Sequence, residues 1–127
     1  MRLELLNKKI LLDTNFLFYL IENKAGFALQ DLQQLNEIFV PSIVIKELKI
    51  LENEKKGFKK KVSEALKLID VVGIKIVEFK GEFADNVLLE ASKEGFIIGT
   101  MDKDLRKQIK SFGGRIIYLR QRKLINY

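Results

Sequence analysis

The sequence predicts an α/β protein, a three-layer α/β/α domain around a central, mainly parallel sheet of five strands. Short, nearly uninterrupted apolar segments alternate along the chain with longer segments whose apolar residues recur at helical spacing. Strands of this composition are typical of parallel sheets that helices cover on both faces. The 127 residues contain no linker, repeat or low-complexity run. We therefore expect residues 1–127 to form a single domain.

The first half of the chain supplies two of the expected strands. The opening apolar run ends abruptly in the letters DTN, and "EIFVP" carries the only proline of the chain. The expected strands are residues 9–13 and 37–41, and the expected helices are residues 14–23, 27–36 and 42–56.

The second half supplies the other three strands, and glycines separate most of its elements. "IKIVEF", "GFIIGT" and "RIIYL" are the apolar runs. The expected strands are residues 74–79, 95–100 and 115–119, and the expected helices are residues 59–70, 82–94 and 102–111.

The composition excludes several kinds of chemistry. The chain has no Cys and no His, so it has no thiol nucleophile, imidazole base, or thiolate or imidazole zinc site. Oxygen ligands are left, and they suit hard ions such as Mg²⁺ or Mn²⁺. The net charge of +6 indicates a polyanionic partner. With no long apolar run and no signal-like start, we expect a cytoplasmic protein without a membrane partner.

Two acids directly follow expected strands. Asp13 comes after "ILL", and Asp102 comes shortly after "FIIG". In parallel α/β sheets, ligands bind in the crevice outside the carboxyl ends of the strands, which is where both side chains would lie. Each acid could instead cap the helix that follows it. Both interpretations stay open for Asp13 and Asp102.

Two further acids lie on expected helices. Asp85 is near the start of its helix, where the helix dipole favours any acid. Glu47 has only apolar neighbours three and four residues away, so it lies in or beside a buried stripe. A carboxylate there is costly unless a Lys, an Arg or a metal ion compensates its charge. Taken together, four convergent acids would suit a two-metal displacement at phosphorus.

The order of four segments resembles the PIN-domain nucleases. The segments are "LLDTN", "PSIVIKELK", "ADNVLLEASKEG" and "IIGTMDKDLR". The ending "GGRIIYLRQRK" is similar to small archaeal PIN proteins related to ribosomal-RNA processing factors, and the resemblance covers residues 8–123. It implies a PIN-like fold and a Mg²⁺- or Mn²⁺-dependent endoribonuclease that cleaves single-stranded RNA. The implied substrate is a ribosomal precursor, and a homodimer is compatible with the sequence.

The resemblance also assigns residues. The acids that match the family's catalytic metal ligands are Asp13, Glu47, Asp85 and Asp102. The small polar or acidic residues that match supporting positions are Thr14, Asn15, Thr100 and Asp104. Met101 departs from the pattern, because the family commonly has Asn there and Met cannot donate a hydrogen bond to an acid.

Basic residues follow Asp102 along one expected helix. They form a stripe that could hold a phosphate backbone, and they are Lys103, Arg106, Lys107 and Lys110. A solvated helix face explains the same pattern. The runs "KKGFKKK" and "RQRK" are further candidates, and Phe58 within the first is expected to be a core anchor at a helix junction.

Three other functions share some of these features. A phosphoacceptor receiver domain needs paired acids at the first strand end, an Asp after the third strand and a Lys after the fifth. Leu12 precedes Asp13, "VEFK" has no Asp and "IIYLR" ends in Arg, so this function is excluded. A non-catalytic RNA-binding module stays open, and metal-dependent cleavage would separate it from a nuclease. The toxin of a toxin–antitoxin pair also stays open, because its motifs overlap these.

Overall fold

The computed structural model describes residues 7–126, which form a mixed sheet with helices on both faces. The strands are β1 (Lys9–Leu12), β2 (Glu37–Pro41), β3 (Lys75–Val77), β4 (Ile97–Gly99), β5 (Ile116–Arg120) and β6 (Lys123–Asn126). The helices are α1 (Thr14–Glu22), α2 (Phe27–Gln33), α3 (Ser42–Glu54), α4 (Phe58–Val72), α5 (Ala84–Lys93) and α6 (Lys103–Ser111).

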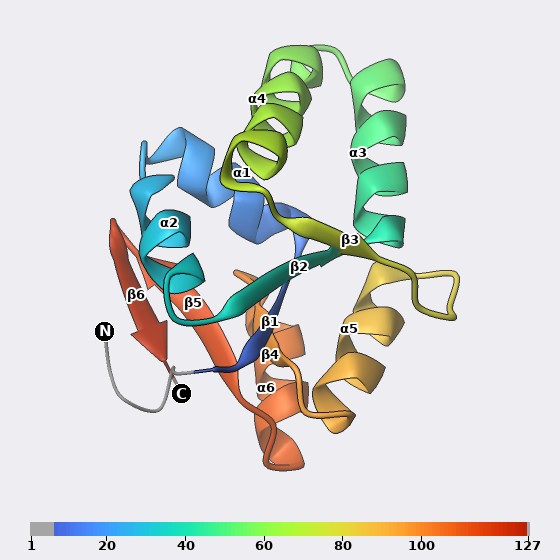
Figure 1. The fold of residues 1–127 in the computed structure, drawn as a ribbon. Helices are drawn as coiled ribbons and strands as arrows, with labels where there is room; N and C mark the ends of the chain where they lie inside the picture. Colours follow the sequence, from blue (N-terminus) through green and yellow to red (C-terminus); the bar gives the residue numbers. More distant parts are fainter. Residues whose placement is uncertain (1–6, 127) are drawn as a thin grey trace.

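The strand order is β3-β2-β1-β4-β5-β6, and every pair from β3 to β5 is parallel. Figure 1 shows α3 and α4 on one side of this sheet and α5 and α6 on the other. The expected three-layer α/β/α architecture is confirmed. No helix in the described part of the chain is both long and apolar enough to cross a membrane.

Alternation along the central strands divides the core in two. Leu12 packs in the larger cluster with the buried residues of α1, α2, α3 and α4. Its neighbour Leu11 points to the opposite face and packs with Leu88 of α5 and Leu105 of α6. Both residues are fully buried, as expected for a strand covered on both faces.

The sheet has six strands rather than the expected five. β6 pairs antiparallel with β5 at the edge of the sheet, through a turn in which Gln121 has a positive φ of 58°. The backbone N–H of Gln121 donates to the hydroxyl of Tyr19 at 2.9 Å, which ties this turn to α1. The "RQRK" run therefore forms a hairpin turn and the start of a strand.

The register between β1 and β4 brings the two DTN- and TMD-containing loops together. Leu12 is the partner of Gly99, and the next N–H, that of Asp13, donates to the Gly99 carbonyl at 2.9 Å. A Cβ on Gly99 would lie 2.6 Å from the Leu12 Cδ2 atom, so any larger residue would force the buried Leu12 side chain to shift. As a result, Asp13 and Thr100 leave adjacent strands at the same edge of the sheet.

Candidate functional site

Asp13 is the buried acid at the carboxyl end of β1. Its side chain is 5% exposed and caps α1 by accepting from the Thr14 N–H through Oδ1 at 2.8 Å. Its other oxygen, Oδ2, lies 3.0 Å from the Thr100 hydroxyl, which can donate to it. The capping interpretation is thus confirmed, and it does not compete with a role at the sheet edge.

The environment of Asp13 disfavours its charge. Burial raises the pKa of this carboxyl to about 6, although the hydrogen bonds from Thr14 and Thr100 act in the opposite direction. The negative charges of Glu47 and Asp85 raise the pKa further. Glu47 of α3 and Asp85 of α5 therefore lie near enough to repel the Asp13 carboxylate at the end of β1.

Thr100 connects the two loops that follow β1 and β4. Its fully buried hydroxyl accepts from the Asp102 N–H at 3.1 Å. The same oxygen lies 3.0 Å from Asp13 Oδ2 and 3.3 Å from Asn15 Oδ1, and its single hydrogen can serve one of these acceptors at a time. Asn15 Oδ1 also accepts from the Met101 N–H at 2.9 Å. The network fixes the position of Asp13 relative to Asp102.

Asp102 caps α6. Its Oδ1 accepts from the N–H groups of Asp104 at 2.9 Å and Leu105 at 3.1 Å, and Oδ2 takes no part in the cap. Capping is confirmed here too. The side chain of Asp104 is exposed, and its observed link to the site is this backbone N–H.

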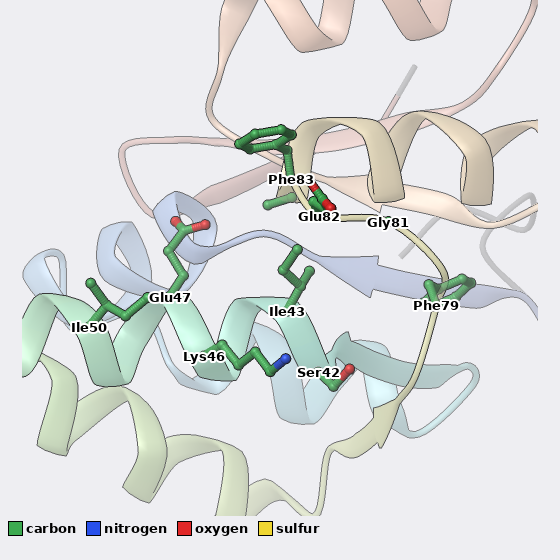
Figure 2. A pocket seen from close by; sticks show the side chains of 10 residues that line it. Ser42, Ile43, Lys46, Glu47, Ile50, Phe79, Gly81, Glu82 and Phe83 are labelled. Atoms are coloured by element: carbon green, nitrogen blue, oxygen red, sulfur yellow. The ribbon is translucent and has the colours of Figure 1, made fainter.

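Asp85 and Glu47 complete the set of acids. Asp85 stands in the first turn of α5, and desolvation followed by the charge of Asp102 raises its pKa. Glu47 is half-buried on α3, and its side chain projects toward the start of α5 (Figure 2). Within residues 7–126 it makes no ion pair, so the Lys or Arg partner considered from the sequence is not found there.

The acids lie near one another but do not form a complete metal-coordination site. Within residues 7–126 no group of three or more acids is arranged to hold a metal ion as the side chains stand. The donors are nevertheless carboxylate oxygens, which suit Mg²⁺ or Mn²⁺, and mutual repulsion of their charges is what a divalent cation would relieve. In their donor chemistry, the residues therefore fit such an ion.

The remaining supporting residues differ in what they do. Thr14 contributes its N–H to Asp13, while its buried hydroxyl has no hydrogen-bond partner among the described residues. Met101 packs against the larger core, and its sulfur accepts from the Leu119 N–H at 3.4 Å. The side chain that departs from the family pattern is therefore used for packing against β5.

The basic stripe lines an open groove beside α6. The groove has a volume of about 590 Å³ and includes all four basic residues, with Tyr118 as its aromatic member. The Arg106 guanidinium lies 4.0 Å from the centre of the Tyr118 ring, while Lys103 and Lys107 are exposed. The groove therefore presents positively charged side chains that follow Asp102 closely in the sequence.

Some residues of the other two basic runs make contacts within the fold. Phe58 packs edge-on against Phe18 with ring centres 5.9 Å apart, so its expected role as an anchor is confirmed. Lys61 of the same run pairs with Glu22. Arg122 of "RQRK" donates to the carbonyl of Lys24 at 3.1 Å.

A pocket between α3 and the segment before α5 was missed from the sequence. Glu47 and Phe83 both line it (Figure 2), and its volume is about 430 Å³. Phe83 is 67% exposed and directly precedes α5. The signal that could have revealed it is an aromatic residue two positions before Asp85, in the letters FAD.

Known proteins share both the sequence pattern and the fold. A model of the PIN-like domain family matches residues 10–122. Ribonuclease VapC4 of Methanocaldococcus jannaschii is 31% identical over 121 residues, which cover 91% of this chain and 92% of that protein. Ribonuclease VapC9 of Archaeoglobus fulgidus is 32% identical over 116 residues, or 89% and 84% of the two chains.

Two solved structures share the fold. A domain of a functionally unknown protein from M. jannaschii has a TM-score of 0.65 at 20% identity, covering 89% of this chain and 91% of that one. A protein from Pyrobaculum aerophilum has a TM-score of 0.51 at 14% identity, covering 83% and 86%. At these identities the likeness concerns the arrangement of the chain alone.

Proposed function

This chain belongs to the PIN-like domain family, and from that premise we propose that it is a metal-dependent endoribonuclease acting on single-stranded RNA. The observation that carries the proposal is the set of mutually repelling acids around buried Asp13. The chain is similar over most of its length to two archaeal ribonucleases, and this similarity supports RNA as the substrate.

Four carboxylates would hold the ion, which is Mg²⁺ or Mn²⁺ in this proposal: Asp13, Glu47, Asp85 and Asp102. A divalent ion, when bound, supplies Lewis acidity and neutralises charge during displacement at phosphorus. Thr100 and Asn15 keep Asp13 in place through their hydrogen bonds, so that one ligand is oriented before an ion arrives. Asp104 is a secondary acid at the exposed start of α6.

The α6 groove would bind the RNA backbone. Lys103, Arg106, Lys107 and Lys110 present cations to phosphates, which fix the position of a strand without reading its sequence. Following the family resemblance, the products are a 5′-phosphate and a 3′-hydroxyl. A homodimer remains part of the proposal and is tested by measuring the mass of the protein in solution.

The decisive experiment uses purified protein and defined single-stranded and structured RNAs. We expect endonucleolytic cleavage of the single-stranded RNA with Mn²⁺ or Mg²⁺, none with EDTA, and loss of cleavage in Asp13→Asn. Equal cleavage with and without EDTA would show that the metal mechanism is wrong. RNA binding without cleavage under all conditions would favour the non-catalytic RNA-binding module.

Two biological settings are consistent with this activity. A ribosomal precursor is the substrate suggested by the ending of the chain, "GGRIIYLRQRK". The toxin of a toxin–antitoxin pair is the second candidate, and similarity to the two VapC ribonucleases supports it. Accumulation of unprocessed ribosomal RNA after depletion of the protein would favour the first. Growth arrest on expression, relieved by a small copurifying protein, would favour the second.

A further inference from the structure

The pocket between α3 and the segment before α5 has two walls of different chemistry. One wall is the face of α3 that carries Ile43, Lys46, Glu47 and Ile50. The other is the segment from Phe79 to Ala84, which crosses over to the start of α5 (Figure 2). The volume of about 430 Å³ falls in the range of pockets that hold small ligands, about 300–1,000 Å³.

The apolar surface of this pocket is unusually open to water. Phe83 is 67% exposed and Ile50 is 52% exposed, and both line the same cavity. Phe79 is held in place by an edge-on contact with Phe96, with ring centres 5.5 Å apart. The exposed ring of Phe83 offers a flat ligand a surface on which to stack.

The path of the second wall is specified by a glycine. Gly81 has a φ of +140°, and a Cβ at this position would lie 2.8 Å from Val87 Cγ2. A side chain would therefore strain the backbone and force either Val87 or this segment to shift. The wall that presents Phe83 thus depends on the absence of a side chain at Gly81.

The pocket is continuous with the acids. Glu47 belongs to both, and Ala84, which lines the pocket, is the chain neighbour of Asp85. A nucleotide whose phosphate lies at the acids would therefore have its base or its neighbour's base within reach of the pocket. Lys46, on the same wall as Glu47, adds a cation that suits a polyanionic strand.

We propose that this pocket receives one unpaired base of the RNA beside the cleaved phosphodiester and stacks it on Phe83. The proposal rests on the proposed ribonuclease function and deepens it, because it identifies how the site selects single-stranded RNA. A base paired in a duplex is stacked within the helix and cannot enter the pocket. The exposed Phe83 ring suits a base and Lys46 suits the phosphate next to it, whereas the carboxylates of Glu47 and Glu82 repel a phosphate unless a bound cation lies between them.

The test measures binding and cleavage on the same RNAs. Short single-stranded oligonucleotides are made with one abasic position moved along the sequence. Binding is followed by fluorescence anisotropy in EDTA, and cleavage is followed separately with Mn²⁺. The proteins are the unaltered chain, Phe83→Ala, Phe83→Trp, and Phe27→Ala as the matched control, since Phe27 is 47% exposed on α2 outside the pocket.

One abasic position should weaken binding to the unaltered protein roughly 5- to 100-fold, in keeping with the loss of one base–aromatic stack. Phe83→Ala should weaken binding of intact RNA to a similar extent and should be insensitive to that abasic position. Phe83→Trp should retain affinity, and Phe27→Ala should behave like the unaltered protein. Thermal melting checks that the variants fold, which the exposure of Phe83 favours.

The binding measurement separates failure of this proposal from failure of the nuclease proposal. A Phe83-dependent abasic effect in EDTA supports the base pocket even if no condition gives cleavage. An abasic effect that is equal in the unaltered protein and Phe83→Ala overturns the pocket, even if cleavage is robust. Unchanged RNA binding by Phe83→Ala overturns it too.

Discussion

At the scale of single residues, Asp13 is the residue on which the candidate site depends. A carboxylate that is 5% exposed is costly to ionise, and it has two nearby negative charges as well as two hydrogen-bond donors. The two hydrogen-bond donors reduce the free-energy cost of ionising Asp13 but do not abolish that cost, because the pKa is still raised to about 6. A position that serves stability alone would be better filled by a neutral cap such as Asn.

We predict that Asp13→Asn stabilises the metal-free protein at neutral pH. The folded-state pKa of about 6 lies above the ordinary 3.8, so the folded protein binds this proton more tightly than the unfolded chain does. Stability is therefore lost as pH rises from about 4 to about 6, and the neutral variant avoids this loss. The gain should be near zero at pH 4 and reach at most about 3 kcal/mol above pH 6.

Urea unfolding in EDTA from pH 4 to pH 8 measures the difference between the free energies of unfolding. Asp70→Asn, which neutralises an exposed acid on α4, is the control and should change stability little at any pH. A difference between Asp13→Asn and the unaltered protein that does not vary with pH would contradict this account of the carboxylate.

Thr100 provides the second prediction at this scale. Thr100→Val keeps the shape but removes a buried donor to Asp13 and a part-buried acceptor for the Asp102 N–H. We expect a loss of about 1–3 kcal/mol in stability, because buried groups lose their partners. Thr100→Ser keeps the hydroxyl and should lose less stability and retain more cleavage. Equal behaviour of the two variants in urea unfolding would remove the hydroxyl from the network.

At the scale of elements, the start of a helix positions each of three acids. Asp13 caps α1, Asp102 caps α6, and Asp85 occupies the first turn of α5. The partial positive charge at these helix starts favours carboxylates there. A carboxylate that caps a helix with one oxygen keeps its other oxygen for a further partner, so capping and the proposed binding role do not exclude each other.

The α6 stripe leads to a salt-dependence prediction. Lys103→Ala with Lys107→Ala should weaken single-stranded RNA binding across sequences, and should reduce the slope of log affinity against log salt by about 0.7 for each phosphate that the variant no longer neutralises. Lys103 and Lys107 are chosen because both are exposed, whereas Arg106 also stacks on Tyr118. Replacing exposed Lys9 of β1 and exposed Lys67 of α4, which belong to none of the basic runs, is the matched control for charge. If both double variants change the slope equally, the stripe is an ordinary solvated face.

At the scale of the whole molecule, the topology brings distant parts of the chain to one edge. β1 lies between β2 and β4, so the segments after these three strands meet at their carboxyl ends. α3 begins directly after β2, which places Glu47 near Asp13 although 34 positions separate them in the chain, from 13 to 47. The whole chain carries a net charge of +6, which favours association with a polyanion.

Metal binding should therefore increase the free energy of unfolding of the whole domain. Mn²⁺ at about 100 times its dissociation constant should stabilise the unaltered protein by roughly 2.7 kcal/mol over the EDTA-treated state. Glu47→Gln should gain less, because it lacks one proposed ligand, and should melt no lower than the unaltered protein in EDTA. Glu54→Gln, at an exposed position on α3, should respond to Mn²⁺ like the unaltered protein. Equal stabilisation of all three proteins would remove Glu47 from the ligand set.

The sequence by itself determined the layered architecture and the place of the strand-end acids. Apolar runs such as Ile10 to Leu12 have no alternative to burial, so the element that contains them and the polar residue that ends them can be identified locally. The caps at Asp13 and Asp102 were likewise among the local interpretations. The short strand β6 was missed because four residues next to a charged turn carry little periodicity.

Only the tertiary structure decided which acid is buried and what surrounds it. The sequence singled out Glu47, which is half-buried, while the deeper burial belongs to Asp13 because β1 is central in the sheet. The Phe83 pocket depends on how the segment through Gly81 crosses to α5, and the stacking of Arg106 on Tyr118 depends on β5 lying beside α6. These are contacts between elements far apart in the chain, and local periodicity carries no information about the distance or rotation that brings them together.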